Sequence, residues 1–147
     1  MPKKVRPIPK GFTTVTPSLT QASSAATIDF CKKAFGAKTR MRLDGPDGKV
    51  MHAEIEIGNA IVMLTDAGRD PAQAGDLFLY SLDVDKTFAK ALKAGATAIM
   101  PPTDMFWGDR FARVEDPSGN KWGIATHIED VTPREIKKRA AAFARPG

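Results

Sequence analysis

The sequence predicts an α+β protein made of two βαβββ modules within one domain, and two observations support this. The order of apolar segments and turns in the first half of the chain recurs from Asp76 onward. The two predicted helices also end alike, in "KKAFGA" and "LKAGA", with Gly36 and Gly95 59 residues apart. A single repeat of about half the structured chain indicates two similar modules, because a solenoid needs about three or more units.

The first module opens on a β-prone run, "TVTPSLT" (14–20). A helix follows in "SSAATIDFCKKAFGA", where apolar residues recur at helical spacing. Ser23 or Ser24 can cap this helix, because a serine side chain accepts a hydrogen bond from an unpaired backbone N–H. Gly36 suits the left-handed residue that ends it. Three strands joined by tight turns come next: "KTRMRL", "VMHAEIEI" and "AIVML".

The second module repeats this order. "LFLYSL" predicts a strand and "DVDKTFAKALKAGA" a capped helix, followed by the strands "TAIMPPT", "DRFARVED" and "KWGIATH". The turn "EDPSGN" between the last two strands is interpreted as architecture. Asp116 and Pro117 start this turn, and Gly119 supplies the positive φ that it needs.

The C-terminal segment predicts a further helix, from about Pro133 to Phe143. Thr132 and Glu135 form a capping box, and proline suits the first helical position. The apolar residues of this helix fall on one stripe (Ile136, Ala140 and Phe143), which we expect to dock on the body of the protein or on a partner subunit.

Length and composition favour one domain with tails. A chain of 147 residues, 42% hydrophobic, can bury one core. We expect a basic N-terminal tail (1–10), a domain at 11–131 with modules at about 11–75 and 76–131, and a C-terminal helix and tail (132–147). The single cysteine, Cys31, excludes an internal disulfide and is interpreted as a core residue.

The net charge of +5 comes from the tails. The body, residues 11–131, contains 13 basic and 16 acidic residues, so no basic face and no specific nucleic-acid partner are expected. No apolar run approaches the roughly 18 residues of a membrane span. The basic N-terminus precedes no apolar segment, so it does not resemble a secretory signal, and a cytoplasmic protein without a membrane partner is expected.

Strand alternation in "VMHAEIEI" predicts which side chains face away from the helix. Met51, Ala53, Ile55 and Ile57 would pack under the helix, and Val50, His52, Glu54 and Glu56 would face the open side. His52 and Glu54 are then close enough to act as an acid/base pair or as metal ligands. The alternative is that both are ordinary solvent-facing residues of a half-exposed strand.

The segment "FWGDR" is a second candidate site. Trp107 can supply an apolar wall and Arg110 a fixed cation for an anionic or planar ligand. Tyr80 and Phe106 are further candidates for the wall, and Trp122 could belong to the wall or to the core. The alternative is that Asp109 and Arg110 pair with other charges to hold the loop or a dimer edge, while Trp107 fills a gap in the core.

Three stretches together resemble the glyoxalase/bleomycin resistance superfamily, also called vicinal oxygen chelate, and more narrowly its PhnB-like branch: "IDFCKKAFGA", "HAEIEIGNAIVML" and "FWGDRFARVEDPSGNKWGIATHIEDV". The resemblance covers roughly Gly11 to Arg139. It implies that the sheets of the two modules form a cup-shaped single domain, and that the protein is a homodimer.

Enzymes of that superfamily hold a divalent metal on the first and last strands of each module. By this resemblance, two of the ligand positions fall on Thr16 and Gly123 and a third falls near Asp76. Threonine and glycine cannot replace imidazole and carboxylate ligands, so the inherited metal site is expected to be absent. A divalent metal held by His52 and Glu54 remains the alternative.

We therefore expect a protein that binds a small organic molecule in the cup, without a cofactor, through His52, Glu54, Tyr80, Phe106, Trp107 and Arg110. The alternative is a metal-dependent lyase, isomerase or dioxygenase, in which Glu54 moves a proton. Whether the protein is an enzyme stays open, with His52 and Glu54 as the candidate catalytic residues.

Overall fold

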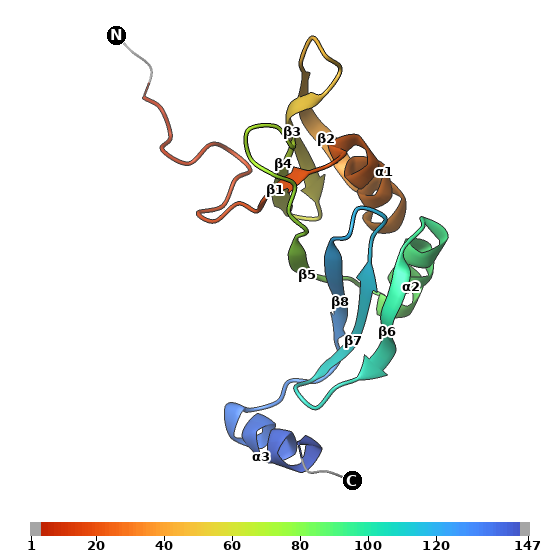
Figure 1. Cartoon of the computed structure of the whole chain (residues 1–147). Coiled ribbons are helices and arrows are strands. Elements are labelled where there is room, and N and C mark those ends of the chain that lie inside the picture. Colours follow the sequence, from red (N-terminus) through yellow and green to blue (C-terminus); the bar gives the residue numbers. More distant parts are fainter. Residues whose placement is uncertain (1–3, 145–147) are drawn as a thin grey trace. The chain divides into compact units, whose positions relative to one another are not determined.

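The computed structural model describes residues 4–144 and divides the chain into two compact units, Met1–Gly75 (unit 1) and Asp76–Gly147 (unit 2). Each unit carries one four-stranded sheet with a helix on one face (Figure 1). The predicted α+β class and the two βαβββ modules are confirmed. None of the helices within residues 4–144 has the length and hydropathy that a membrane span requires.

Unit 1 contains β1 (Ser18–Gln21), α1 (Ser24–Phe35), β2 (Lys38–Asp44), β3 (Val50–Ile57) and β4 (Ala60–Asp66). The strand order is β1-β4-β3-β2, with β1 parallel to β4 and the other pairs antiparallel. Ser23 caps α1 by accepting a hydrogen bond from the backbone N–H of Ala26, and Gly36 ends the helix at a φ of 68°. Both helix signals in the sequence are confirmed.

The predicted alternation in β3 is wrong at its first two residues. Val50 is buried with 2% exposure, whereas Met51 is 56% exposed. The register between β2 and β3 shifts between Leu43 and Asp44, and such a bulge inverts the alternation locally. From His52 onward the prediction is confirmed, because Ala53 and Ile55 are buried and His52 and Glu54 are half-buried.

The first strand also begins later than expected, at Ser18 and not at Thr14.

Unit 2 contains β5 (Asp76–Tyr80), α2 (Val84–Lys93), β6 (Thr97–Asp104), β7 (Asp109–Glu115), β8 (Lys121–His127) and α3 (Pro133–Phe143). The strand order is β5-β8-β7-β6, with β5 parallel to β8. Trp122 is 1% exposed and donates a hydrogen bond from Nε1 to Asp116 Oδ2, 2.9 Å away. This places Trp122 in the core and removes it from the candidate binding wall.

The turn between β7 and β8 is architectural, as the sequence indicates. Asp116 Oδ1 accepts hydrogen bonds from the backbone N–H groups of Ser118 and Asn120, both at 2.9 Å. Gly119 has a φ of 88°, in the left-handed region that favours glycine. The carboxylate of Asp116, which is 4% exposed, therefore holds both the turn and the indole of the core tryptophan.

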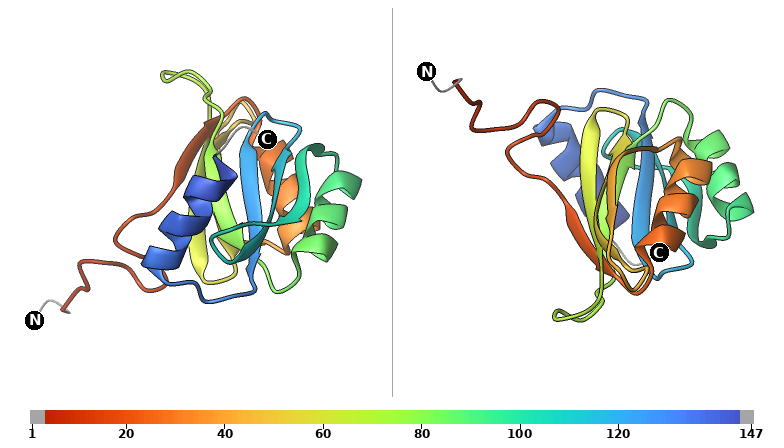
Figure 2. Two further views of the ribbon diagram at one scale, coloured as in Figure 1. Left: turned by 90° about the horizontal axis from the view of Figure 1, so that it is seen from below. Right: turned by 90° about the horizontal axis from the view of Figure 1, so that it is seen from above.

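The C-terminal helix α3 runs from Pro133 to Phe143, as predicted, and Thr132 Oγ1 accepts a hydrogen bond from the Glu135 backbone N–H. The helix contacts its own unit: the rings of Phe143 and Phe106 lie 5.2 Å apart, and Arg139 Nη1 donates to the Phe106 carbonyl. Helices α2 and α3 lie on opposite sides of β8 in both views of Figure 2.

Candidate ligand-binding site

The face of the second sheet that α2 leaves uncovered carries three aromatic rings from β5 and β7. Strand pairing places Phe78 beside Gly123, Tyr80 beside Ala125, and Phe111 across from Ala125. Neighbouring residues in paired strands project from the same side of a sheet. Phe78, Tyr80 and Phe111 therefore share one face with the small residues of β8.

These rings continue into the loop before β7 and into α3. Phe78 stacks on Phe111 with ring centroids 5.5 Å apart and an interplanar angle of 7°, and Tyr80 packs edgewise on Phe78 at 5.2 Å. Centroid distances of 5.8 Å, 5.1 Å and 5.2 Å then join Phe111 to Trp107, Trp107 to Phe106 and Phe106 to Phe143. We call these six rings the aromatic face: Phe78, Tyr80, Phe106, Trp107, Phe111 and Phe143.

Gly123 allows the stacked rings to lie against β8. A Cβ atom at this position would lie 2.9 Å from Phe78 Cδ2 and 3.0 Å from Phe111 Cε2, closer than side chains pack. The rings nevertheless leave large areas uncovered, because Phe78 is 50% exposed and Tyr80 64% exposed. Exposed aromatic surface that adjoins polar groups is typical of a ligand-binding site.

Asp109 connects the aromatic face to a polar network. Its carboxylate is buried at 2% exposure and accepts hydrogen bonds from Tyr80 Oη at 3.0 Å and Trp107 Nε1 at 2.9 Å. The other oxygen lies 2.8 Å from His127 Nδ1. The opposite ring nitrogen of His127 lies 2.7 Å from Asp130 Oδ1. Asp109 thus fixes three of the side chains around the site.

These contacts change three pKa values. Burial acts to raise the pKa of Asp109, but hydrogen bonds from His127, Trp107 and Tyr80 outweigh it and hold the pKa below its usual value. The hydrogen bond to Asp109, followed by that to Asp130, raises the pKa of His127. The hydrogen bond to Asp109, together with burial, raises the pKa of Tyr80.

The raised pKa of His127 predicts a pH-dependent contribution to stability. The folded state favours the imidazolium, so this contribution is fully present below the pKa of His127 in the unfolded chain and is lost as pH rises through the folded-state pKa. Between about pH 6 and about pH 9, the free energy of unfolding should therefore fall more for the wild type than for His127→Gln. Urea denaturation across this range measures both slopes, and equal slopes would contradict the assignment.

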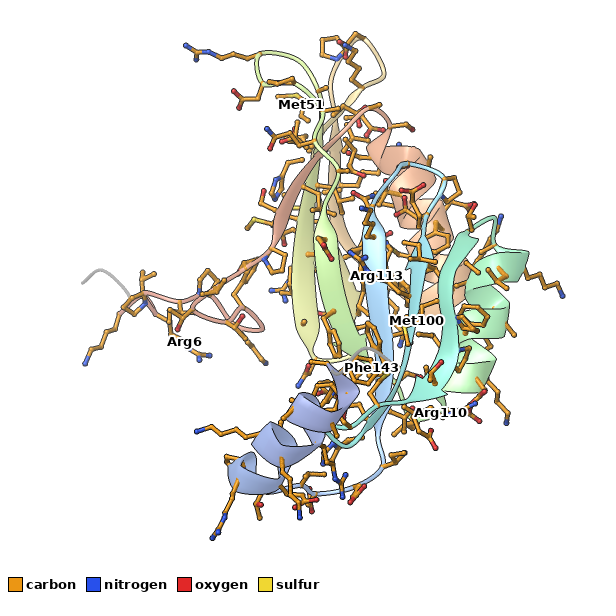
Figure 3. The ribbon with its side chains drawn as sticks, turned by 60° about the horizontal axis from the view of Figure 1, so that its bottom comes forward. Arg6, Met51, Met100, Arg110, Arg113 and Phe143 are labelled. Carbon is orange, nitrogen blue, oxygen red and sulfur yellow. The ribbon has the colours of Figure 1, made fainter. Side chains whose placement is uncertain are left out.

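Arg110 lies on the opposite face of the sheet from the aromatic face, next to α2 (Figure 3). Its guanidinium donates to both carboxylate oxygens of Asp85, at 2.8 Å and 3.0 Å, and to Asp104 at 3.0 Å. These hydrogen bonds raise the pKa of Arg110 still further. The expectation of an Arg110 cation available beside Trp107 is thereby corrected in favour of the alternative, in which Arg110 holds the loop through acidic partners.

His52 and Glu54 form a pair on the open face of the first sheet, as the spacing predicts. His52 Nε2 lies 2.9 Å from Glu54 Oε2, and Arg40 Nε lies 3.6 Å from the other oxygen of Glu54. Arg40 is a partner that the sequence did not indicate. Its guanidinium also lies over the ring of Phe12, 5.1 Å from the centroid. This pair belongs to unit 1, whereas Tyr80, Phe106 and Trp107 belong to unit 2.

The structure shows what lies beside two of the expected metal positions, Gly123 and Asp76. Gly123 offers no ligand atom, and the space beside it is filled by Phe78 and Phe111. Asp76 pairs with Arg113 at 3.1 Å. Within the side chains that the structure describes, no three His, Cys, Asp or Glu residues converge as a metal site. His52 and Glu54 supply two donors, short of the three or four of a stable divalent site.

Comparison with protein families identifies the relatives of this chain. The model of the Glyoxalase/Bleomycin resistance protein/Dioxygenase superfamily matches residues 15–124. The chain belongs to this superfamily. Uncharacterized proteins of Mycobacterium bovis and Mycobacterium tuberculosis are each 37% identical over 135 residues, which is 84% of this chain and 89% and 79% of those relatives.

Solved structures of the superfamily fold are also similar. TioX from Micromonospora sp. ML1 has a TM-score of 0.67 at 24% identity, covering 79% of this chain and 99% of that one. A PhnB protein from Bacillus cereus has a TM-score of 0.60 at 17% identity (78% and 99% covered). A glyoxalase/bleomycin resistance protein/dioxygenase from Nocardioides has 0.60 at 20% (89% and 90%). At these identities the likeness concerns the fold.

Proposed function

We propose that this superfamily member binds a small organic molecule with a flat ring on the aromatic face of unit 2, and that binding needs no metal ion. The observation that carries the proposal is the half-exposed stack of Phe78 on Phe111, continued by Tyr80 and Trp107. A planar ligand gains apolar contact on such rings and fits their offset geometry.

The polar network supports preorganisation of this face. Asp109 holds both Tyr80 and Trp107 by their polar atoms, so these two rings lose little further freedom when a ligand packs on them. A ligand-binding role of this kind requires an apolar surface with a few placed polar groups and no reacting constellation. Homodimer formation, expected from the sequence, remains a separate prediction.

The second candidate is a metal-dependent lyase, isomerase or dioxygenase. The contact of 2.9 Å between His52 and Glu54 is the observation that favours it, because this imidazole and carboxylate could move a proton together. The two candidates differ in their response to a chelator. Ligand binding by the aromatic face should be unchanged by the chelator, whereas a metal-dependent site should lose binding and regain it with one divalent ion.

The test of the proposed function removes one ring of the stack. We expect Phe78→Ala to weaken the binding of quinoline, a neutral planar probe, about tenfold, since stacking on one aromatic side chain contributes about 1–3 kcal/mol. Leu92→Ala removes an exposed apolar side chain from α2, on the other side of the sheet, and should leave the affinity unchanged. Titration calorimetry with and without a chelator measures these affinities. Equal losses in both variants would refute the site.

A further inference from the structure

We infer that the ligand of the aromatic face carries a positive charge beside its flat ring, for example a quaternary aromatic nitrogen. This inference rests on the proposed function and specifies the chemical class of its ligand. It follows from the charges around the six rings and from the hydrogen bonds that two of the rings make.

Acidic groups outnumber basic ones where the aromatic face meets the polar network. Asp109 and Asp130 lie on either side of one imidazole, so this group has a net charge of about −1 even when His127 is protonated. An anion would add to that negative charge, whereas a cation would balance it.

Two further basic side chains, both on the strands of this face, have acidic neighbours. Arg113, which adjoins Gly123, donates to Asp76 Oδ2 at 3.1 Å. Lys121, at the far end of β8, is paired in register with Asp76 on one side and Glu115 on the other. The strands of this face therefore present aromatic surface and carboxylates, which together favour a cation.

The hydrogen bonds of two of the rings increase their attraction for a cation. Tyr80 and Trp107 both donate their single polar hydrogen to Asp109. A hydrogen bond to a carboxylate polarises its donor and moves electron density into the ring. Since the face of an aromatic ring attracts cations through its negative quadrupole, this polarisation strengthens cation–π contact at both residues.

Protonation of His127 should regulate binding. The titratable and charged groups that face this imidazole are Asp109 on β7, Asp130 after β8, Tyr80 on β5 and the Glu129–Arg139 ion pair that joins α3 to the same loop. When His127 loses its proton, both aspartates remain without a balancing charge. Affinity for a cation should therefore rise as pH increases through the pKa of His127.

The experiment compares planar two-ring probes of different charge at pH 8: 1-methylquinolinium (a cation), quinoline (neutral) and 2-naphthoate (an anion). The expected order of affinity is cation, neutral molecule, anion, with the cation about tenfold tighter than quinoline. Fluorescence quenching or calorimetry measures each dissociation constant. Raising the pH from about 6 to about 9 should tighten binding of 1-methylquinolinium several-fold.

Variants that each remove one carboxylate charge test which side chains cause the preference for a cation. Asp130→Asn should weaken the cation several-fold and leave quinoline within twofold. Asp109→Asn, which also loosens Tyr80 and Trp107, should weaken the cation several-fold more than it weakens quinoline. Asp130 is fully exposed, so its variant tests the inference even if Asp109→Asn does not fold. Asp85→Asn is the matched control, because it removes an equal charge on the α2 side of the sheet. The cation should bind this control as it binds the wild type.

The outcomes separate the two proposals. If quinoline and 2-naphthoate bind as tightly as 1-methylquinolinium, the charge inference is wrong and the proposed function stands. If none of the probes binds, the proposed function fails and the charge inference fails with it. A preference for the cation that persists in Asp109→Asn and Asp130→Asn would also overturn the inference.

Discussion

Replacement of Gly108 by alanine is expected to destabilise unit 2 by about 3 kcal/mol or more. Gly108 has a φ of 105°, a conformation that L side chains rarely adopt. A Cβ atom there would also meet the backbone oxygen of Glu129. The chain cannot move away easily, because the Gly108 carbonyl accepts hydrogen bonds from the backbone N–H groups of Ile128 at 2.9 Å and Glu129 at 3.0 Å.

Gly95→Ala is the matched control for this prediction. Gly95 lies in the same unit with a similar φ of 109°, but its nearest neighbour is a side-chain atom, Pro117 Cγ, at 3.2 Å. The backbone conformation alone should cost about 1–2 kcal/mol there. Urea denaturation followed by tryptophan fluorescence measures both variants, since Trp107 and Trp122 both belong to unit 2. Similar losses would show that the contact with Glu129 contributes nothing.

The order of elements could be predicted because each boundary has its own local signal. Ser23 and Asp83 cap the two module helices, and the turn at Asp116 has its own hydrogen-bonding residues. Local signals could not predict the reversal of Val50 and Met51, which depends on a bulge against the neighbouring strand. A shift in pairing leaves no trace in the alternation of one strand alone.

The candidate site could be predicted only in part. The sequence singled out Tyr80, Phe106 and Trp107, which the structure brings into one network with Asp109. Phe78 and Phe111 were missed, although Phe78 alternates with Tyr80 along one strand. Their stacking depends on the strand order β5-β8-β7, which places residues 33 apart on either side of Gly123. That order follows from the packing of the whole sheet.

The face on which Arg110 lies can be predicted from the strand pattern alone. Ala112 and Val114 lie two and four residues after Arg110 in β7, and both are completely buried under α2. Since side chains alternate along a strand, Arg110 must lie on the same face of the sheet as Ala112 and Val114. Asp109 and Phe111 must lie on the opposite face. The position of His127 follows in the same way from Gly123 and Ala125 in β8.

Asp109→Ala should cost about 3 kcal/mol of folding free energy, the largest loss expected for a polar side chain of the aromatic face. The carboxylate is 2% exposed and accepts hydrogen bonds from three side chains. Hydrogen bonds to a charged group contribute about 1.5–3 kcal/mol each. The total should stay below the sum of three such bonds, because Tyr80 and His127 are exposed enough for water to replace their lost partner.

Two further variants identify the cause of this loss. Asp109→Asn keeps the shape and removes the charge, so we expect it to lose about half as much stability as Asp109→Ala. Asp104→Ala removes an exposed carboxylate that pairs with Arg110 at 3.0 Å, and exposed ion pairs contribute about 0–1 kcal/mol. Thermal and urea denaturation compare the three proteins. If Asp109→Ala costs no more than Asp104→Ala, the network around Asp109 does not stabilise the aromatic face, and preorganisation of Tyr80 and Trp107 must be abandoned as support for ligand binding.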